Sequence, residues 1–296
     1  MNNTKIEAKE KVKVEPTDIR SLEIMKHDMR RKRPDFPHLK LESGEQPLEE
    51  FKVAPQLKHK LRKQFMPTMP GAKYAKLKAS LRAKKPSAKL KIAQPLAPAI
   101  LIEEFEGATD VDAVMPPDTH GAAGLQEFVE TTNMHIDIYQ KADPTQRTSI
   151  SLAAFFGYFA QALFDARVIY DTEWNRWVIT ADAFPESPDV QYHFIAVSMT
   201  PSALDSFFIY AVNVTFNSGD FWDYPQLGMD QDSIIITANI FSAAGNFNGA
   251  DMFAIAKAQL YNGWGFWVPV FTGLEATLAP PIVLDQNANT FLIAAP

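Results

Sequence analysis

The sequence predicts an all-β domain that follows a basic N-terminal arm, and three observations support this prediction. Residues 1–100 carry 24 Lys and Arg against 11 Asp and Glu, a net charge of +13, whereas residues 101–296 carry 5 against 24, a net charge of −19. From about residue 125, short runs rich in β-branched and aromatic residues recur between turn signals. Helical periodicity is scarce in the same region. We therefore divide the chain into an arm, 1–100, and a β domain, 101–296.

The arm is expected to be mostly disordered. Residues 1–54 combine charges and prolines with few aromatic residues, which leaves too little apolar surface to offset the entropy lost on ordering. Short helices are expected near 56–65 and 72–83, and helices of this length are marginal in water unless they dock on something. Two basic clusters, 30–33 and 73–85, suit an anionic polymer, membrane or acidic protein surface, although a solvated tail is the simpler alternative.

The domain is predicted to contain many short strands. A hairpin is expected where two β-rich runs flank the polar turn 172–175. Residues 151–164 are expected to start as a strand and continue as a short helix. Such a series of antiparallel strands predicts a sandwich, a barrel or a propeller. The expected strands are 127–132, 134–139, 166–170, 177–182, 192–199, 207–214, 233–241, 252–259, 266–271, 282–284 and 290–294.

Four motifs occur in order along the domain. They are PPDTHGAAG at 116–124 followed by a strand and Asn133, DARVIYD at 165–171 followed by Arg176-Trp177, IAVSMT at 195–200, and the DYPQLG turn at 223–228. Together they resemble a largely uncharacterised family of bacterial β-propeller proteins with the patterns PPDTxGxVG, DPxVxYD…RW, AVSxT and DYPxLG. Leu125 and Ala166 depart from the family, which usually has proline at both positions.

The resemblance implies a partial β-propeller of about four blades over 115–296. Because the family's propellers are larger, we expect either a C-terminally truncated chain or a half-propeller completed by another chain or a second copy. The resemblance also implies a secreted or cell-envelope protein, yet the N-terminus has neither the apolar core nor the small-residue cleavage site of a signal peptide. No apolar run is long enough for a membrane-spanning helix, and without cysteine there are no disulfides or thiolate metal sites.

Three turn aspartates are the candidate metal ligands. Asp118, Asp171 and Asp223 each lie in a motif of the resembled family, where equivalent motif residues often converge near a propeller's central channel. Carboxylates on oxygen-rich loops are the ligands that Ca²⁺ prefers, so Ca²⁺ is the candidate cofactor. Asp165, Asp220 and Asn239 are further possible ligands. The alternative is that each aspartate only accepts backbone N–H bonds and stabilises its own turn.

The candidate ligand-binding residues combine aromatic rings with the loop residues Asp118 and His120. Exposed aromatic rings beside carboxylates suit sugar stacking, and Trp222, Tyr224 and Trp264 are the candidates. Ordinary core packing is the alternative for each ring.

No catalytic constellation is visible, so we expect a noncatalytic binding or scaffold domain for a glycan or a protein. Two other functions stay open. One is a glycan hydrolase with a carboxylate pair such as Asp118 and Asp171. The other is docking of the arm to an anionic polymer or surface.

Overall fold

The described part of the chain is almost entirely β structure. The computed structural model describes residues 10–14, 44–45, 105–108, 116–275, 277–283, 290 and 292–294. Within them only two short helices occur, α4 (Leu152–Phe156) and α5 (Lys257–Leu260). The predicted all-β class is therefore confirmed. No helix in these residues has the length and apolar character needed to cross a membrane.

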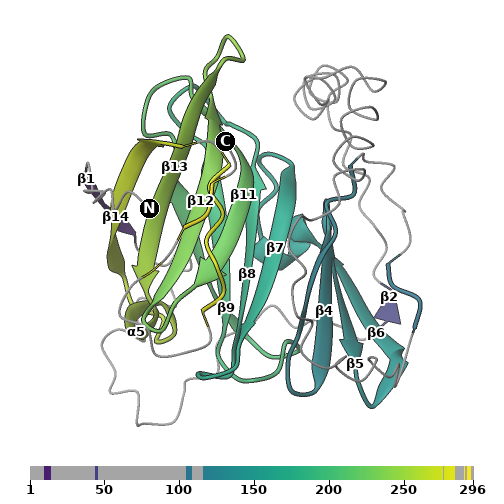
Figure 1. Ribbon diagram of the computed structural model, residues 1–296. Coiled ribbons are helices and arrows are strands. Elements are labelled where there is room, and N and C mark those ends of the chain that lie inside the picture. The colour runs from purple at the N-terminus through teal and green to yellow at the C-terminus, as the bar shows by residue number, and fades with distance from the viewer. Residues whose placement is uncertain are drawn as a thin grey trace, which may run out of the picture. The chain divides into compact units, whose positions relative to one another are not determined.

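Twelve of the strands form three runs of four, each run antiparallel and in chain order (Figure 1). The first run is β3 (His120–Ala123), β4 (Glu127–Thr132), β5 (His135–Gln140) and β6 (Asp143–Ser151). The second is β7 (Leu163–Asp171), β8 (Arg176–Ala183), β9 (Tyr192–Ser198) and β10 (Phe207–Asn213). The third is β11 (Phe221–Met229), β12 (Ser233–Phe241), β13 (Phe247–Ala256) and β14 (Phe266–Leu274). We call these the first, second and third sheets.

Two short segments of the arm extend the outer sheets. The strand β1 (Glu10–Val14) pairs antiparallel with β14, and β2 (Gly44–Glu45) pairs parallel with β6. The expected helices near 56–65 and 72–83 and both basic clusters lie outside the described residues.

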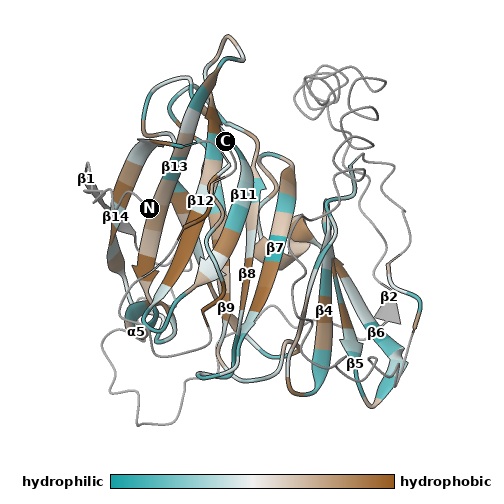
Figure 2. Cartoon of the chain, in the orientation of Figure 1, coloured by the Kyte–Doolittle hydropathy of each residue, from teal (hydrophilic) through white to brown (hydrophobic). Residues whose placement is uncertain are grey.

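The first strands of the three sheets are neighbours, because β3 contacts β7 and β7 contacts β11. The core forms two hydrophobic clusters, one shared by the second and third sheets and the other by the first and second. Trp222 belongs to the former and Trp177 to the latter, and both are fully buried. In Figure 2 the hydrophobic residues, coloured brown, lie along the strands of the sheets. Burial of apolar surface on both faces explains why β7, β8 and β9 read as nearly continuous apolar runs.

The predicted hairpin is confirmed, since β7 and β8 pair across the turn after Asp171. Within the β domain, three strands lie where none was predicted, namely β3, β6 and β11, and the arm strands β1 and β2 were not predicted either. The motif PPDTHG leads directly into β3, and the DYPQLG motif is part of β11 rather than a turn. Ser151 is the last residue of β6 and the N-cap of α4, because its Oγ accepts a bond from Ala154 N–H. The expected change from strand to helix therefore occurs at Ser151. At the C-terminal end the structure describes isolated bridges, Met229 with Ile282 and Ala279 with Ile293.

Candidate functional site

Four aspartates gather where the three sheets meet. Asp118 lies just before β3, Asp165 on β7, Asp182 on β8 and Asp223 on β11. The last three are at most 1% exposed, and the carboxyl groups lie close enough together that Asp118 and Asp182 raise the pKa values of Asp165 and Asp223. We call these residues the aspartate cluster.

Irregular backbone places these side chains. The pairing of β7 with β8 shifts register between Phe164 and Arg167, and Asp165 between them has a φ of 51°. The pairing of β11 with β12 shifts after Asp223, where Tyr224 has a φ of 56°. Bulges of this kind re-aim side chains next to functional sites. A bulge therefore positions the aspartate side chain in each of the two strands.

Asn133 connects the cluster to the first sheet. Its Nδ2 donates to Pro116 O and to Asp118 Oδ2, both at 2.8 Å, and its Oδ1 accepts a bond from Asp165 N–H at 2.7 Å. Asp118 also acts on Asp165 electrostatically, because it is one of the neighbouring carboxyl groups that raise the pKa of Asp165. The motif residues before β3, after β4 and on β7 thus form one network.

The electrostatics favour protonated carboxyl groups. Burial raises the pKa of Asp165 and Asp182 well above the usual range of aspartate, and neighbouring carboxylates add to the shift at Asp165. Burial and then the charge of Asp182 raise the pKa of Asp223 to about 7. Arg167 supplies a positive charge that favours ionised Asp182, and its Nε donates to Pro225 O at 3.0 Å.

Both histidines near the cluster are engaged in structural contacts. His193 Nδ1 lies 2.5 Å from Asp182 Oδ1, and burial lowers the pKa of His193 to about 3. His120 was a candidate ligand-binding residue, but its Nδ1 accepts a bond from Val168 N–H at 3.3 Å. Burial and the charge of Arg167 lower the pKa of His120.

The three candidate metal ligands do not meet. Asp118 and Asp223 both belong to the cluster, whereas Asp171 is six residues beyond Asp165 on β7, which is about 20 Å along a strand. The same separation places Asp171 too far from Asp118 for a hydrolytic carboxylate pair. Among the described residues, no three His, Cys, Asp or Glu side chains are arranged to hold a metal ion.

Other predicted residues have separate environments. Trp222 is 1% exposed within the core, so its ring offers no open face to a sugar. Arg167 covers the ring of Tyr224, with its Cζ 5.7 Å from the centroid. Asp220 accepts bonds from neighbouring asparagines, and Asn239 Oδ1 accepts a bond from a backbone N–H near the C-terminus.

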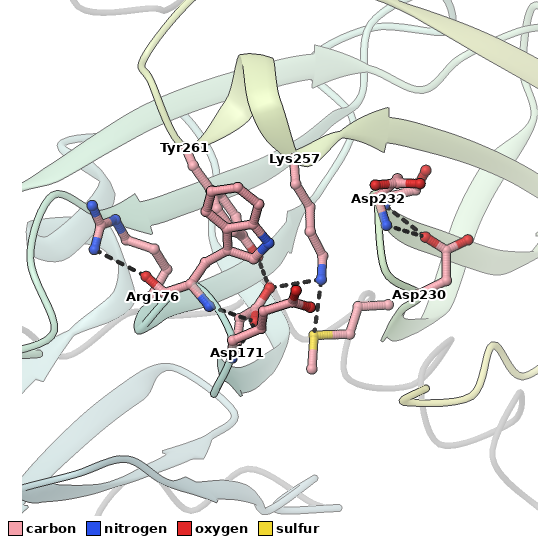
Figure 3. A network of polar contacts seen from close by, with 10 residues as sticks. Asp171, Arg176, Asp230, Asp232, Lys257 and Tyr261 are labelled. Carbon is pink, nitrogen blue, oxygen red and sulfur yellow. Dashed lines mark hydrogen bonds and ion pairs between the residues drawn. The ribbon is translucent and has the colours of Figure 1, made fainter. Parts of the chain in front are cut away.

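Asp171 is the centre of a second polar network (Figure 3). Its Oδ2 accepts a bond from the Tyr261 hydroxyl and pairs with Lys257 Nζ, both at 2.7 Å. Its Oδ1 accepts bonds from the N–H groups of Glu173 and Trp174 in the β7–β8 turn. The carboxylate therefore links this turn to α5 and the residue that follows it.

Two exposed tryptophans each lie three positions after a residue of this network, Trp174 after Asp171 and Trp264 after Tyr261, and we call them the tryptophan pair. Trp174 is 53% exposed, and its ring meets that of Tyr261 edge-on with centroids 6.5 Å apart. Trp264 is 39% exposed; its N–H donates to Gln259 O at 3.0 Å, and its carbonyl accepts a bond from the Tyr210 hydroxyl at 3.2 Å. Trp264 was predicted as a ligand-binding residue. Trp174 was not, because the polarity of its neighbours signalled only a turn.

Comparisons of this chain with protein-family models, with curated proteins and with solved structures found no match. The resemblance drawn from the four motifs therefore stays a prediction.

Proposed function

We propose that this protein is a noncatalytic binding protein that recognises a neutral glycan through the tryptophan pair. The observation that carries this proposal is that Trp174 and Trp264 are exposed while hydrogen bonds hold their backbones in place. A rigid, exposed indole is a natural platform for the apolar face of a sugar ring and loses little conformational entropy on binding.

The surroundings favour a neutral glycan over an anionic one. Glu173 is exposed in the same turn as Trp174, and the Arg176 guanidinium beside it already donates to the carbonyls of Trp174 and Asn175. The β domain as a whole carries a net charge of −19, which repels polyanions. Exposed Thr172 and Glu173 offer hydrogen-bonding groups to sugar hydroxyls.

We further propose that the three sheets are blades of a β-propeller. Each blade of a propeller is a four-stranded antiparallel sheet, and the blades surround a central channel. The chain-order pairing of each run and the contacts among β3, β7 and β11 support this arrangement. The aspartate cluster would then lie near the channel axis.

The test is isothermal titration calorimetry with soluble β-glucan, xylan and mannan. We expect one of them to bind, and Trp264→Ala to weaken that binding by about tenfold, or about 1.4 kcal/mol. The control is Trp267→Ala, because Trp267 is 57% exposed on β14 and lies outside the pair. Unchanged binding in Trp264→Ala would contradict the proposal. Release of reducing ends by the wild-type protein would favour a hydrolase, and failure of all three glycans to bind would favour a protein ligand.

A further inference from the structure

We infer that Asp171, Lys257 and Tyr261 position Trp174 relative to Trp264, so that the tryptophan pair forms two sugar subsites at a fixed spacing. This inference rests on the proposed glycan-binding function. It goes further because it assigns Trp174 as a second subsite and gives the buried polar network a role in binding.

Asp171 connects the turn that carries Trp174 to α5 and to Tyr261. One carboxylate oxygen holds the turn that carries Trp174, through the N–H groups of Glu173 and Trp174 at 3.0 and 3.2 Å. The other oxygen is held by Lys257 and Tyr261. Figure 3 shows the Lys257 and Tyr261 side chains converging on Asp171 while the Arg176 side chain extends away from it. A shift of α5 would therefore move this carboxylate and the turn with it.

The helix α5 also holds the backbone of Trp264. The carbonyl of Gln259, in α5, accepts the bond from Trp264 N–H. Tyr261 follows α5 directly, and Trp264 is three positions further along the chain, a reach of at most about 11 Å. Both tryptophans are thus attached to α5, one through the second sheet and one through the third.

Burial makes the network rigid. Asp171 and Lys257 are 1% and 3% exposed, and Lys257 Nζ also lies 3.8 Å from Met229 Sδ. Removing one partner of such a pair leaves an uncompensated buried charge and threatens folding. Tyr261→Phe is the sharper variant, since it removes only the hydroxyl bonded to Asp171 and keeps the ring against Trp174.

Two subsites at a fixed spacing predict a dependence on ligand length. Once an oligosaccharide reaches both indoles, the second contact becomes intramolecular and the affinity rises steeply. A single subsite predicts little change from disaccharide to hexasaccharide.

The experiment measures Kd for cello-, xylo- and manno-oligosaccharides, from disaccharide to hexasaccharide, by calorimetry. We expect the wild-type affinity to rise about tenfold or more over the series that binds. Trp174→Ala should abolish that rise and keep the affinity for the disaccharide. Tyr261→Phe should reduce the rise and likewise keep the affinity for the disaccharide.

The control is Tyr158→Phe, which removes a tyrosine–carboxylate bond to Glu186 remote from α5, and we expect no change in the rise. If Tyr261→Phe lowers the melting temperature but leaves the length dependence intact, the network is only structural and the inference fails. If Trp174→Ala leaves the rise intact while Trp264→Ala still weakens binding, the second subsite fails and the proposed function survives. If Trp264→Ala has no effect, the proposed function itself fails.

Discussion

Gly124 illustrates at the scale of one residue why the first motif ends in glycine. Its Cα faces the indole of Trp177, which is fully buried and donates from Nε1 to Pro201 O at 3.0 Å. A Cβ at position 124 would lie closer to the Trp177 indole than Cβ atoms in proteins approach other heavy atoms. Because the indole is fixed by packing and by its hydrogen bond, it cannot move aside. The glycine allows the chain entering β4 to pass over the core.

We expect Gly124→Ala to lower the free energy of unfolding by about 1–3 kcal/mol, the usual cost of overpacking a core. Urea denaturation followed by circular dichroism measures this change. Gly121→Ala is the matched control, because the nearest atom to its Cβ would be the far end of the half-buried Phe128 side chain at 2.8 Å, with Val129 O at an ordinary contact distance of 3.4 Å. Equal losses in the two variants would show that the Trp177 contact does not decide the cost.

Single residues also mark the limit of sequence reasoning about the site. Asp118 and Asp223 were selected because they lie in turn-rich motifs, and the structure does bring them together. Asp171 had the same local signal but lies at the far end of β7, bound to Lys257. The sequence distance between Asp171 and Lys257 hides this pairing. Asp182 sits inside an apolar strand, where no turn signal draws attention to it.

At the scale of elements, β7 and β11 repeat one design. Each has an aspartate at its third position next to a bulge, Asp165 and Asp223. β7 ends at Asp171 and β11 is followed directly by Asp230, and the Oδ1 of each aspartate accepts backbone N–H bonds from the following turn. Both turn aspartates are labelled in Figure 3. Asp171 differs in pairing with a buried lysine, Lys257, which ties its turn to α5.

The aspartate cluster predicts that stability falls as pH rises above about 6.5. In the unfolded chain aspartate ionises near pH 3.9 and histidine near 6.5. Asp165, Asp182 and Asp223 have raised pKa values in the folded protein, that of Asp223 to about 7, so the folded state holds protons that the unfolded state has lost. The three aspartates therefore make their full contribution to the free energy of unfolding below pH 4. This contribution decreases as the pH rises through their folded-state pKa values. The lowered pKa values of His193 and His120 give a slope of the opposite sign, because the unfolded state binds protons there that the folded state does not; this opposing slope fades above pH about 7.5, where histidine is largely neutral in both states.

Urea denaturation between pH 6.5 and 8.5 measures the slope, which is about 1.4 kcal/mol per pH unit for each proton retained. Asp223→Asn should make the slope shallower, whereas Asp189→Asn, at an exposed loop position, should not. An unchanged slope in Asp223→Asn would contradict the prediction. A rise in melting temperature with Ca²⁺ at pH 8, lost in Asp223→Asn, would instead indicate that the carboxylates bind a cation.

The element order was largely predictable from alternation and turn signals, and β4 and β12 match their predicted ranges. The failure at β11 has a physical cause. Asp223, Tyr224 and Pro225 carry turn chemistry because a bulge lies there, yet pairing with β12 resumes at Gln226. A local signal cannot distinguish a turn that ends a strand from a bulge that interrupts one.

At the scale of the whole molecule, the arm protects two sheet edges. β1 pairs with β14 at the edge of the third sheet, and β2 pairs with β6 at the edge of the first. An uncovered edge strand exposes unpaired N–H and C=O groups that template pairing with another chain. The sequence predicted a mostly disordered arm, and nothing in the local composition of residues 10–14 identifies the distant strand with which they pair.

Deletion of residues 1–14 should therefore promote self-association. Size-exclusion chromatography with light scattering should show a concentration-dependent dimer or larger species, and the melting temperature should fall by a few degrees. Deletion of residues 1–9 is the control, because it keeps β1. Association in both deletions, or in neither, would argue against a protective role for this strand.

The pairing of β1 with β14 also has a consequence for synthesis. Val14 lies opposite Phe266, which the ribosome adds roughly 250 residues later. At roughly 5–20 residues per second, translation takes roughly 10–50 seconds to produce the partner. Throughout that time β1 has no partner strand in the nascent chain. The third sheet becomes complete only when β14 has left the exit tunnel.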